Sequence, residues 1–248
     1  MHPILFHIGP IKIFSYGFMI ALGLFLSFVI IRRRGEYRGI KPDQLIDLMI
    51  ATTCVGLIGA RILYVLRFNE EYRDNWLGVV RVWEGGLVLY GGTITALLFL
   101  LVYSKIKQKR FFLLTDAIVP YFAFVQAFGR IGCFMNGCCG GAVTDSIFGM
   151  QFPHTHYYVH PTQLYSAFVC FLVAAVLFLI NKPNVRVGFT TTVYFLLYPV
   201  GRFFVEFLRV NPKVFWGVFS HAQMISIVLF ILAVFIFITK RFWNYHEQ

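Results

Sequence analysis

The sequence predicts an all-α integral membrane protein with seven transmembrane helices and an outward-facing irregular loop between helices 4 and 5. Three observations support this fold class. Of the 248 residues, 58% are hydrophobic and 13% are charged, with a mean hydropathy of +0.72, whereas soluble domains carry about 25% charged residues. Seven apolar segments approach the roughly 20 residues that a membrane span requires. The basic residues gather in alternate connections between these segments.

The seven expected spans follow one another along a single membrane domain of residues 1–248. The first ends before Arg32-Arg33-Arg34 and has no small-residue cleavage site, which indicates an anchor and not a signal peptide. The fourth ends just before Arg130, and the fifth opens after Pro161, a residue that suits the first turn of a helix. The spans are residues 14–31, 44–66, 86–104, 111–129, 162–180, 188–207 and 220–239.

The distribution of charge predicts the orientation of the chain. Residues 32–41, 105–110, 181–186 and 240–241 contain 13 of the 22 Lys and Arg. Because basic connections stay in the cytoplasm, this pattern places the N-terminus outside and the C-terminus inside. The loop of residues 130–161 then faces outward. We interpret the net charge of +11 in this way, and not as a sign of nucleic-acid binding.

The most informative run is residues 128–141, FGRIGCFMNGCCGG. Hydrocarbon tolerates a guanidinium poorly, so Arg130 at the end of an apolar span indicates a functional site. The glycines that follow it leave backbone N–H groups open to a ligand. The run therefore predicts a pocket at the membrane surface for an anionic group, most simply a phospholipid head group.

Other charged residues interrupt the spans. Arg202 and Glu206 are four residues apart and share a helix face, which Arg209 is expected to extend. Arg202 lies about two turns deeper in the span than Arg209, where inserting a charge costs about 2.5–3.5 kcal/mol. A functional role is therefore favoured for Arg202, and Glu206 can hold Arg202 in position. For Arg209, snorkelling to the interface remains an alternative. Structural roles are expected for Asp47, Arg61 and Asp116.

Two shorter runs combine glycine or proline with polar side chains. Residues 83–92, WEGGLVLYGG, place Tyr90 between two glycine pairs. Small-residue helix packing with Tyr90 as an interface anchor is one interpretation, and the wall of a cavity is the other. Tyr16-Gly17 is a weaker version of the same feature. Residues 160–165, HPTQLY, open the fifth span, where a polar group is either a helix cap or part of a phosphate site.

Three cysteines and three histidines share the loop that follows Arg130. The spacing C-x4-C-C of Cys133, Cys138 and Cys139 matches no strong zinc signature, so no metal site is predicted. A disulfide of Cys133 with either neighbour, a catalytic thiol without an evident base, and small buried thiols remain open. Cys54 and Cys170 are expected to be inert core residues. The histidines are His154, His156 and His160.

Six runs, in this order, resemble the prolipoprotein diacylglyceryl transferase family of bacterial inner-membrane enzymes. Their joint order and the seven-helix layout make the resemblance specific, although one run alone would be a weak match. The resemblance covers the chain from end to end. The runs are Tyr16-Gly17 and residues 83–92, 129–141, 160–165, 201–209 and 220–226.

The resemblance implies a reaction in the bacterial plasma (inner) membrane, within the lipid bilayer. The family transfers the diacylglyceryl group of phosphatidylglycerol to the lipobox cysteine in the signal peptide of a preprolipoprotein, forms a thioether and releases glycerol phosphate. Arg130 and Arg202 match the family's two essential arginines, and Tyr90 matches a position of either His or Tyr. The substrate-binding positions assigned with them are Tyr16, Gly91, Gly92, Gly132, Asn136, Gly137, Gly141, His160, Gln163, Glu206 and Arg209.

The sequence departs from the family signature at three places. Cys133 stands where the family usually has Asn, Cys138 where it has Glu, and His221-Ala222 where it has Gly. The chain therefore lacks an amide and a carboxylate that would hold polar groups, which bears on substrate preference and activity.

The residues suggest a mechanism without a metal or organic cofactor. Arg130 and Arg202 are expected to bind the leaving phosphate from opposite sides of a cavity, because a guanidinium binds phosphate through paired hydrogen bonds. Gly132, Asn136 and Gly137 would add donors, Tyr90 is the candidate base for the incoming thiol, and His160 is the alternative base. Two other functions remain open, a lipid transporter and a membrane thiol–disulfide enzyme that uses the three clustered cysteines.

Overall fold

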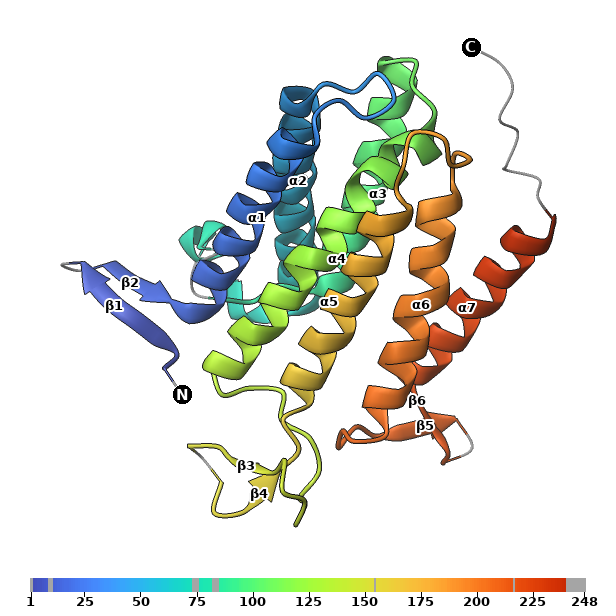
Figure 1. The fold of residues 1–248 in the computed structure, drawn as a ribbon. Helices are drawn as coiled ribbons and strands as arrows, with labels where there is room; N and C mark the ends of the chain where they lie inside the picture. Colours follow the sequence, from blue (N-terminus) through green and yellow to red (C-terminus); the bar gives the residue numbers. More distant parts are fainter. Residues whose placement is uncertain are drawn as a thin grey trace. The chain divides into compact units, whose positions relative to one another are not determined.

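The computed structural model describes residues 2–8, 11–72, 76–81, 85–153, 155–215 and 217–239 (Figure 1). The chain divides into a first unit of residues 1–33 and 116–248 and a second unit of residues 34–115. All seven segments that were expected to be helical form helices. These are α1 (Ser15–Arg34), α2 (Pro42–Arg67), α3 (Leu89–Ile106), α4 (Phe111–Met135), α5 (Thr162–Ile180), α6 (Phe189–Glu206) and α7 (His221–Thr239).

Six of the seven helices are long and apolar enough to cross a membrane, namely α1 to α5 and α7. Within the described residues, α6 has the length of a span but not its apolarity, and this differs from the seven equivalent spans that were predicted. The reason is its polar content, because Thr190, Thr191, Thr192 and Glu206 are all buried inside the protein.

Helix α4 runs further than the sequence suggested, and α6 ends earlier. Arg130 was expected where the span ends, yet α4 continues to Met135, so Arg130 is a helical residue. The helix passes Gly129 and Gly132, because an internal glycine costs only about 1 kcal/mol relative to alanine. The first residue after α4 with a left-handed backbone is Gly137, at a φ of 72°. Arg209 lies beyond the end of α6 and not on its face, which corrects the predicted stripe of three charges.

The N-terminal segment and the connections contain short hairpins that the all-α prediction missed. Their strands have two to five residues, too few for an alternating hydrophobic pattern to emerge from the sequence. One hairpin lies within the loop of residues 136–161, which was expected to be irregular. The antiparallel pairs are β1 (Ile4–Ile8) with β2 (Ile11–Phe14), β3 (Met150–Gln151) with β4 (Tyr158–Val159), and β5 (Lys213–Phe215) with β6 (Phe219–Ser220). Two 3-10 turns, η1 (Asn69–Tyr72) and η2 (Trp76–Val80), follow α2.

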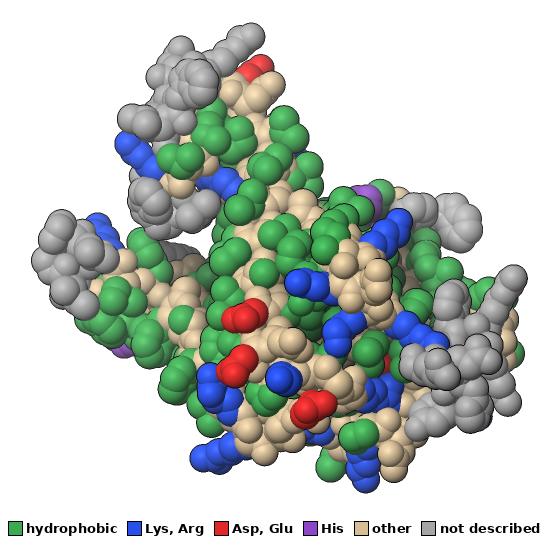
Figure 2. Space-filling view, turned by 90° about the horizontal axis from the view of Figure 1, so that it is seen from above, with side chains coloured by type: hydrophobic (Ala, Val, Ile, Leu, Met, Phe, Trp, Pro, Cys, Tyr) green, Lys and Arg blue, Asp and Glu red, His purple; other side chains and the backbone are tan. Residues whose placement is uncertain are grey.

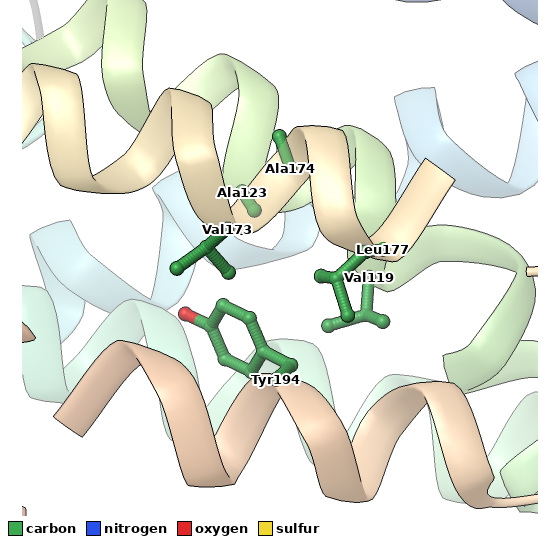
Figure 3. Close-up of a cluster of buried hydrophobic side chains, with 6 residues drawn as sticks. All are labelled: Val119, Ala123, Val173, Ala174, Leu177 and Tyr194. Carbon is green, nitrogen blue, oxygen red and sulfur yellow. The ribbon is translucent and has the colours of Figure 1, made fainter. Parts of the chain in front are cut away.

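The core of the first unit lies where α4, α5 and α6 meet. Figure 3 shows the ring of Tyr194 from α6 among small and branched side chains of α4 and α5. Alternating small and large residues let the three helices interlock at close range. The buried cluster consists of Val119, Ala123, Val173, Ala174, Leu177 and Tyr194.

A buried carboxylate joins α4 to the start of α6. Asp116, fully buried on α4, accepts hydrogen bonds from the backbone N–H of Gly188 at 2.6 Å and of Thr191 at 2.8 Å, and from the Thr191 hydroxyl at 2.6 Å. It therefore satisfies the free N–H groups of the first turn of α6 and complements the helix dipole there. This is the structural role that the sequence suggested for Asp116.

In the second unit, α2 and α3 pack at very short range. A Cβ on Gly91 would lie 2.4 Å from the carbonyl oxygen of Gly59, and one on Gly92 would lie 2.9 Å from that of Gly56. Both glycines thus permit backbone contact between antiparallel helices, as in small-residue helix packing. Arg61 is also structural, as predicted. Its guanidinium donates to the carbonyls of Gly78, Val79, Gly85 and Gly86.

In the second unit, basic residues gather where α2 begins and α3 ends. In the second unit, residues 34–41 and 105–110 lie together, and Lys109 Nζ donates to the carbonyl of Gly39 at 3.3 Å. Figure 2 shows Lys and Arg side chains gathered on the face that is seen from above in that view. The predicted basic pair at residues 240–241 lies outside the described residues.

Candidate active site

Two arginines that are 72 positions apart in the sequence line one pocket of the first unit. Arg130 reaches this pocket from α4 and Arg202 from α6, while α5 supplies the third side. The structure thus brings together the two residues that were predicted to act on a phosphate. The remaining lining residues are Ser166, Val169, Cys170, Tyr198, Gly201 and Val205.

Arg202 is held by a carboxylate one helical turn away. Its Nη2 lies 2.8 Å from Oε2 of Glu206, in the i,i+4 pairing that the spacing predicted. The other oxygen of Glu206 accepts from Asn211 Nδ2 at 2.5 Å and from Ser220 Oγ at 2.9 Å. Both oxygens of this buried carboxylate are therefore engaged, which fixes one side of the guanidinium.

A second nitrogen of Arg202 is a buried donor that is left unsatisfied by the described residues. Within the part of the chain that the structure describes, its buried Nη1 has no hydrogen-bond partner. An unsatisfied buried donor costs about 1–3 kcal/mol, and more when it is charged. An anionic oxygen that enters the pocket would remove this cost, so the arrangement favours binding of an anion beside Arg202.

Arg130 is positioned by aromatic side chains. Its guanidinium interacts electrostatically with the hydroxyl of Tyr198, which lines the same pocket. Tyr198 in turn stacks on Tyr194, with ring centroids 5.4 Å apart and planes 10° apart. Sequence reasoning missed Tyr198, although its position four residues before Arg202 places both on one face of α6.

Tyr16 approaches Arg130 from α1. It interacts electrostatically with Arg130 and Cys133. The approach requires Gly132, because a Cβ there would lie 3.0 Å from the Cα of Tyr16. Gly132 therefore acts through close helix packing, and its own N–H lies inside α4, where it is not a free donor as the sequence had suggested.

The loop after α4 is braced by the first turn of α5. Gln163 Nε2 donates to the carbonyl of Cys138 at 2.5 Å, and Thr162 Oγ1 donates to that of Cys139 at 3.0 Å. Gly141 N–H donates to the carbonyl of His160 at 2.8 Å. A Cβ on Gly141 would lie 2.3 Å from the carbonyl oxygen of Leu208, so only glycine fits there. These contacts place the loop against the segment that leaves α6.

Two predicted donors of this loop are already engaged. The N–H of Gly137 donates to the carbonyl of Phe134 at 3.0 Å, and the side chain of Asn136 interacts with the thiol of Cys138 and lowers its pKa. A polar side chain was a candidate cap for this helix, but the N-cap residue of α5 is Pro161 and no side chain caps it. The ring of His160 instead lies near the hydroxyl of Tyr165, with Nδ1 at 3.4 Å from it.

The three cysteines of the loop meet in space. The Sγ atoms of Cys133, Cys138 and Cys139 all lie within 4.8 Å of one another, as free thiols. A side-chain hydrogen bond from Cys133 lowers the pKa of Cys139 to about 5, and nearby Arg209 and Arg130 act in the same direction. Burial raises the pKa of Cys138. Two other cysteines differ from each other, because Cys170 is buried as expected whereas Cys54 is exposed on α2.

Some predicted site residues lie elsewhere or outside the described residues. Tyr90 is exposed on the first turn of α3, in the second unit, and Gly91 and Gly92 beside it face α2. Arg209, beyond α6, interacts electrostatically with Cys139. His156 is exposed. Trp83, Glu84 and His154 lie outside the described residues.

Comparison with known sequences gives the family. A sequence model of prolipoprotein diacylglyceryl transferase matches residues 3–239. The chain belongs to this family. Relatives named phosphatidylglycerol–prolipoprotein diacylglyceryl transferase include one from Clostridium tetani, 33% identical over 98% of this chain and 99% of its own length. One from Clostridium perfringens, whose name carries the suffix 2, is 35% identical over 96% of this chain and 94% of its own length. One from Bacillus velezensis is 32% identical over 100% of this chain and 95% of its own length.

Family membership agrees with the architecture. Six apolar helices in a family of this name identify a multi-pass membrane protein. The near-complete coverage of the relatives means that the two-arginine pocket belongs to the shared part of the chain and not to an added segment.

Proposed function

We propose that this protein transfers the diacylglyceryl group of phosphatidylglycerol to the lipobox cysteine of a preprolipoprotein signal peptide. The observation that carries the proposal is the pair of arginines on one pocket, one of which keeps a buried guanidinium nitrogen without a partner within the described residues. The relatives of this transferase family carry names that state the same donor and the same class of acceptor.

The reaction exchanges one bond for another at the glyceryl group. The thiolate sulfur attacks the glyceryl carbon that bears the phosphodiester oxygen, a carbon–sulfur bond forms, and the carbon–oxygen bond breaks. Glycerol phosphate leaves with the bonding electrons, and the thiol proton passes to a base or to water. Arg130 and Arg202 would stabilise the negative charge on the leaving phosphate, because charge-assisted hydrogen bonds from guanidinium to phosphate are short and strong.

The other assigned residues support this step. Glu206 would keep Arg202 oriented through its 2.8 Å ion pair. Tyr16 and Tyr198 border Arg130 and would orient the head group through their hydroxyls. Tyr90 stays the candidate base and His160 the alternative. Gly91, Gly92, Gly132, Asn136, Gly137, Gly141, Gln163 and Arg209 remain assigned to the substrate site by their match to the family motifs.

The membrane arrangement is part of the proposal. We place all seven helices of this single domain across the bacterial plasma membrane, with the N-terminus outside and the C-terminus in the cytoplasm. Within the first unit, Gly132 of α4 packs against Tyr16 at the start of α1. Arg32 and Arg33 at the end of α1 therefore lie away from Arg130, as expected if the loop after Arg130 faces outward. The polar residues of α6 are tolerated because they face protein and not lipid.

A lipobox peptide incubated with the purified protein in phosphatidylglycerol liposomes tests the proposal. Mass spectrometry is expected to show a diacylglyceryl adduct on the peptide cysteine, dependent on phosphatidylglycerol and absent with phosphatidylethanolamine. Arg130→Ala and Arg202→Ala should abolish the adduct, and Arg130→Lys should lose most of it, because lysine lacks the planar fork of arginine. Arg33→Ala, at an exposed arginine, is the matched control.

The same assay separates the alternative functions. A folded, lipid-embedded preparation that forms no adduct would contradict the transferase. Replacement of Cys133, Cys138 and Cys139 by serine should leave substantial transfer, whereas a thiol–disulfide enzyme would lose its function. Consumption of phospholipid with formation of a thioether would exclude lipid transport as the sole activity.

A further inference from the structure

The three clustered thiols lie at distances that suit a metal ion. In the described residues, Cys133, Cys138 and Cys139 form the one group of three His, Cys, Asp or Glu side chains whose ligand atoms lie within 4.8 Å of one another. Zinc–thiolate bonds of about 2.3 Å in tetrahedral or trigonal geometry place sulfurs about 4 Å apart. A small contraction of the side chains would therefore bring all three sulfurs into a coordination sphere.

The backbone builds this cluster through a tight turn. Cys133 lies on the last turn of α4, and the chain then reverses through Gly137, at a φ of 72°, and Cys139, at a φ of 66°. The N–H of Cys138 donates to the carbonyl of Cys133 at 3.2 Å. The turn thus returns two thiols to the side of the helix that carries the first, which the spacing C-x4-C-C does not reveal.

Contacts from α5 hold the turn in place. Gln163 and Thr162 donate to the carbonyls of Cys138 and Cys139, as described above. The amide of Gln163 is almost fully buried, and its Oε1 has no hydrogen-bond partner in the described part of the chain. An unpaired acceptor beside the cluster suits a ligand that brings a donor with it, such as a metal-bound water.

We propose that Cys133, Cys138 and Cys139 form a three-thiolate site for a thiophilic metal ion, Zn²⁺ or Cu⁺. Thiolates are soft ligands that select these two ions over Mg²⁺ or Ca²⁺. Three sulfurs complete a trigonal Cu⁺ site, or leave one position of a tetrahedral Zn²⁺ site to water. A disulfide would engage only two of the three thiols and leave the third unexplained.

The site lies next to the candidate active site without being part of it. Cys133 follows Arg130 by three residues on α4, so the two share a helix face. A bound ion would connect this last turn to the loop that α5 braces. The ion is therefore expected to order the loop, and not to take part in the transfer of the diacylglyceryl group.

Metal binding to the reduced, detergent-solubilised protein tests the site. Equilibrium dialysis against Zn²⁺, and separately against Cu⁺ under anaerobic conditions, should give one ion per chain. X-ray absorption should show three sulfur neighbours. Cys133→Ser, Cys138→Ser and Cys139→Ser should each weaken binding at least tenfold, while Cys54→Ser, at an exposed cysteine of α2, should bind as the unmodified protein does.

A second measurement avoids dependence on the folding of variants. In the unmodified protein, bound ion should slow alkylation of Cys133, Cys138 and Cys139 at least tenfold and leave alkylation of Cys54 unchanged, as peptide mass spectrometry would show. Fewer than three sulfur neighbours, or equal alkylation of the three thiols with and without ion, would overturn the proposal. A disulfide between two of the three cysteines would also overturn it, if it is found in active protein under the reducing conditions of the binding assay.

Discussion

At the scale of single residues, each buried charged side chain of the site is compensated by a neighbouring residue. Arg202 needs a counter-charge because it is largely buried, and Glu206 supplies it. Glu206 in turn needs donors for its second oxygen, which Asn211 and Ser220 supply. The position of the catalytic candidate therefore depends on residues up to 18 positions further along the chain, as far as Ser220.

Glu206→Gln is expected to reduce transferase activity about 10- to 100-fold. The loss of a charge-assisted interaction costs about 1.5–3 kcal/mol, and each 1.4 kcal/mol corresponds to a factor of ten. Initial rates with the lipobox peptide, taken well below the unfolding temperature, measure the effect. Glu36→Gln, at an exposed glutamate, serves as control. Turnover by Glu206→Gln at the level of the control would contradict the positioning role.

The sequence predicted the ion pair of this arrangement but not the hydrogen bonds that support it. The i,i+4 spacing predicted the Arg202–Glu206 pair, because helix periodicity depends only on nearby residues. Asn211 and Ser220 could not be predicted, because their contacts depend on how the chain turns after α6. Likewise, the spacing of the cysteines gave no indication that their three thiols meet.

At the scale of helices, a contact that helps to hold helices together can be tested in each of the two units. In the first unit it is the carboxylate of Asp116, which receives three hydrogen bonds from the start of α6. In the second unit it is the direct approach of the α2 and α3 backbones. The first depends on charge and the second on the absence of side chains, so they should respond differently to substitution.

Asp116→Ala is expected to destabilise the protein by several kcal/mol. The substitution leaves two backbone N–H groups and one hydroxyl without their buried acceptor, each at a cost of about 1–3 kcal/mol. Thermal unfolding in detergent, followed by circular dichroism, measures the change. Asp145→Ala removes an exposed carboxylate and should leave the transition unchanged. Equal transitions for the two variants would show that α6 does not depend on Asp116.

Gly91→Ala and Gly56→Ala test the contact of α2 with α3. A Cβ on Gly91 would overlap the carbonyl of Gly59 at 2.4 Å, whereas one on Gly56 would meet its nearest neighbour at an ordinary 3.5 Å. Gly91→Ala should therefore lower the unfolding temperature and Gly56→Ala should not. An unchanged unfolding temperature for Gly91→Ala would mean that the helices separate without cost, and a lower one for Gly56→Ala would mean that the 3.5 Å contact is already too close. The sequence left helix packing and a cavity wall open for these glycines, because a glycine pattern does not say which neighbour it faces.

At the scale of the whole molecule, the family and the membrane class were evident from the sequence. Hydropathy and motif order suffice for both, because each is a property of composition along the chain. Helix ends were less predictable. α4 passes two glycines to reach Met135, and the polar face of α6 is hidden by packing that hydropathy does not record.

The orientation of the chain can be measured with thiol reagents. In a background without the other cysteines, Cys139 should react with a membrane-impermeant maleimide in intact cells, because the loop after α4 faces outward in the proposed topology. A cysteine introduced by Lys107→Cys, in the basic connection after α3, should react only after permeabilisation. Labelling of Lys107→Cys in intact cells would reverse the predicted orientation.

The two helices that bear the arginines are tied together at both ends. Asp116 fastens the start of α4 to the start of α6, and beyond the far ends the N–H of Ala142 donates to the carbonyl of Leu208 at 2.8 Å. Because α4 and α6 are hydrogen-bonded near both of their ends, they are not expected to move apart. Admission of a bulky lipid therefore calls for side-chain rotation or a shift of other helices, so cross-linking α4 to α6 should leave the rate of turnover largely intact.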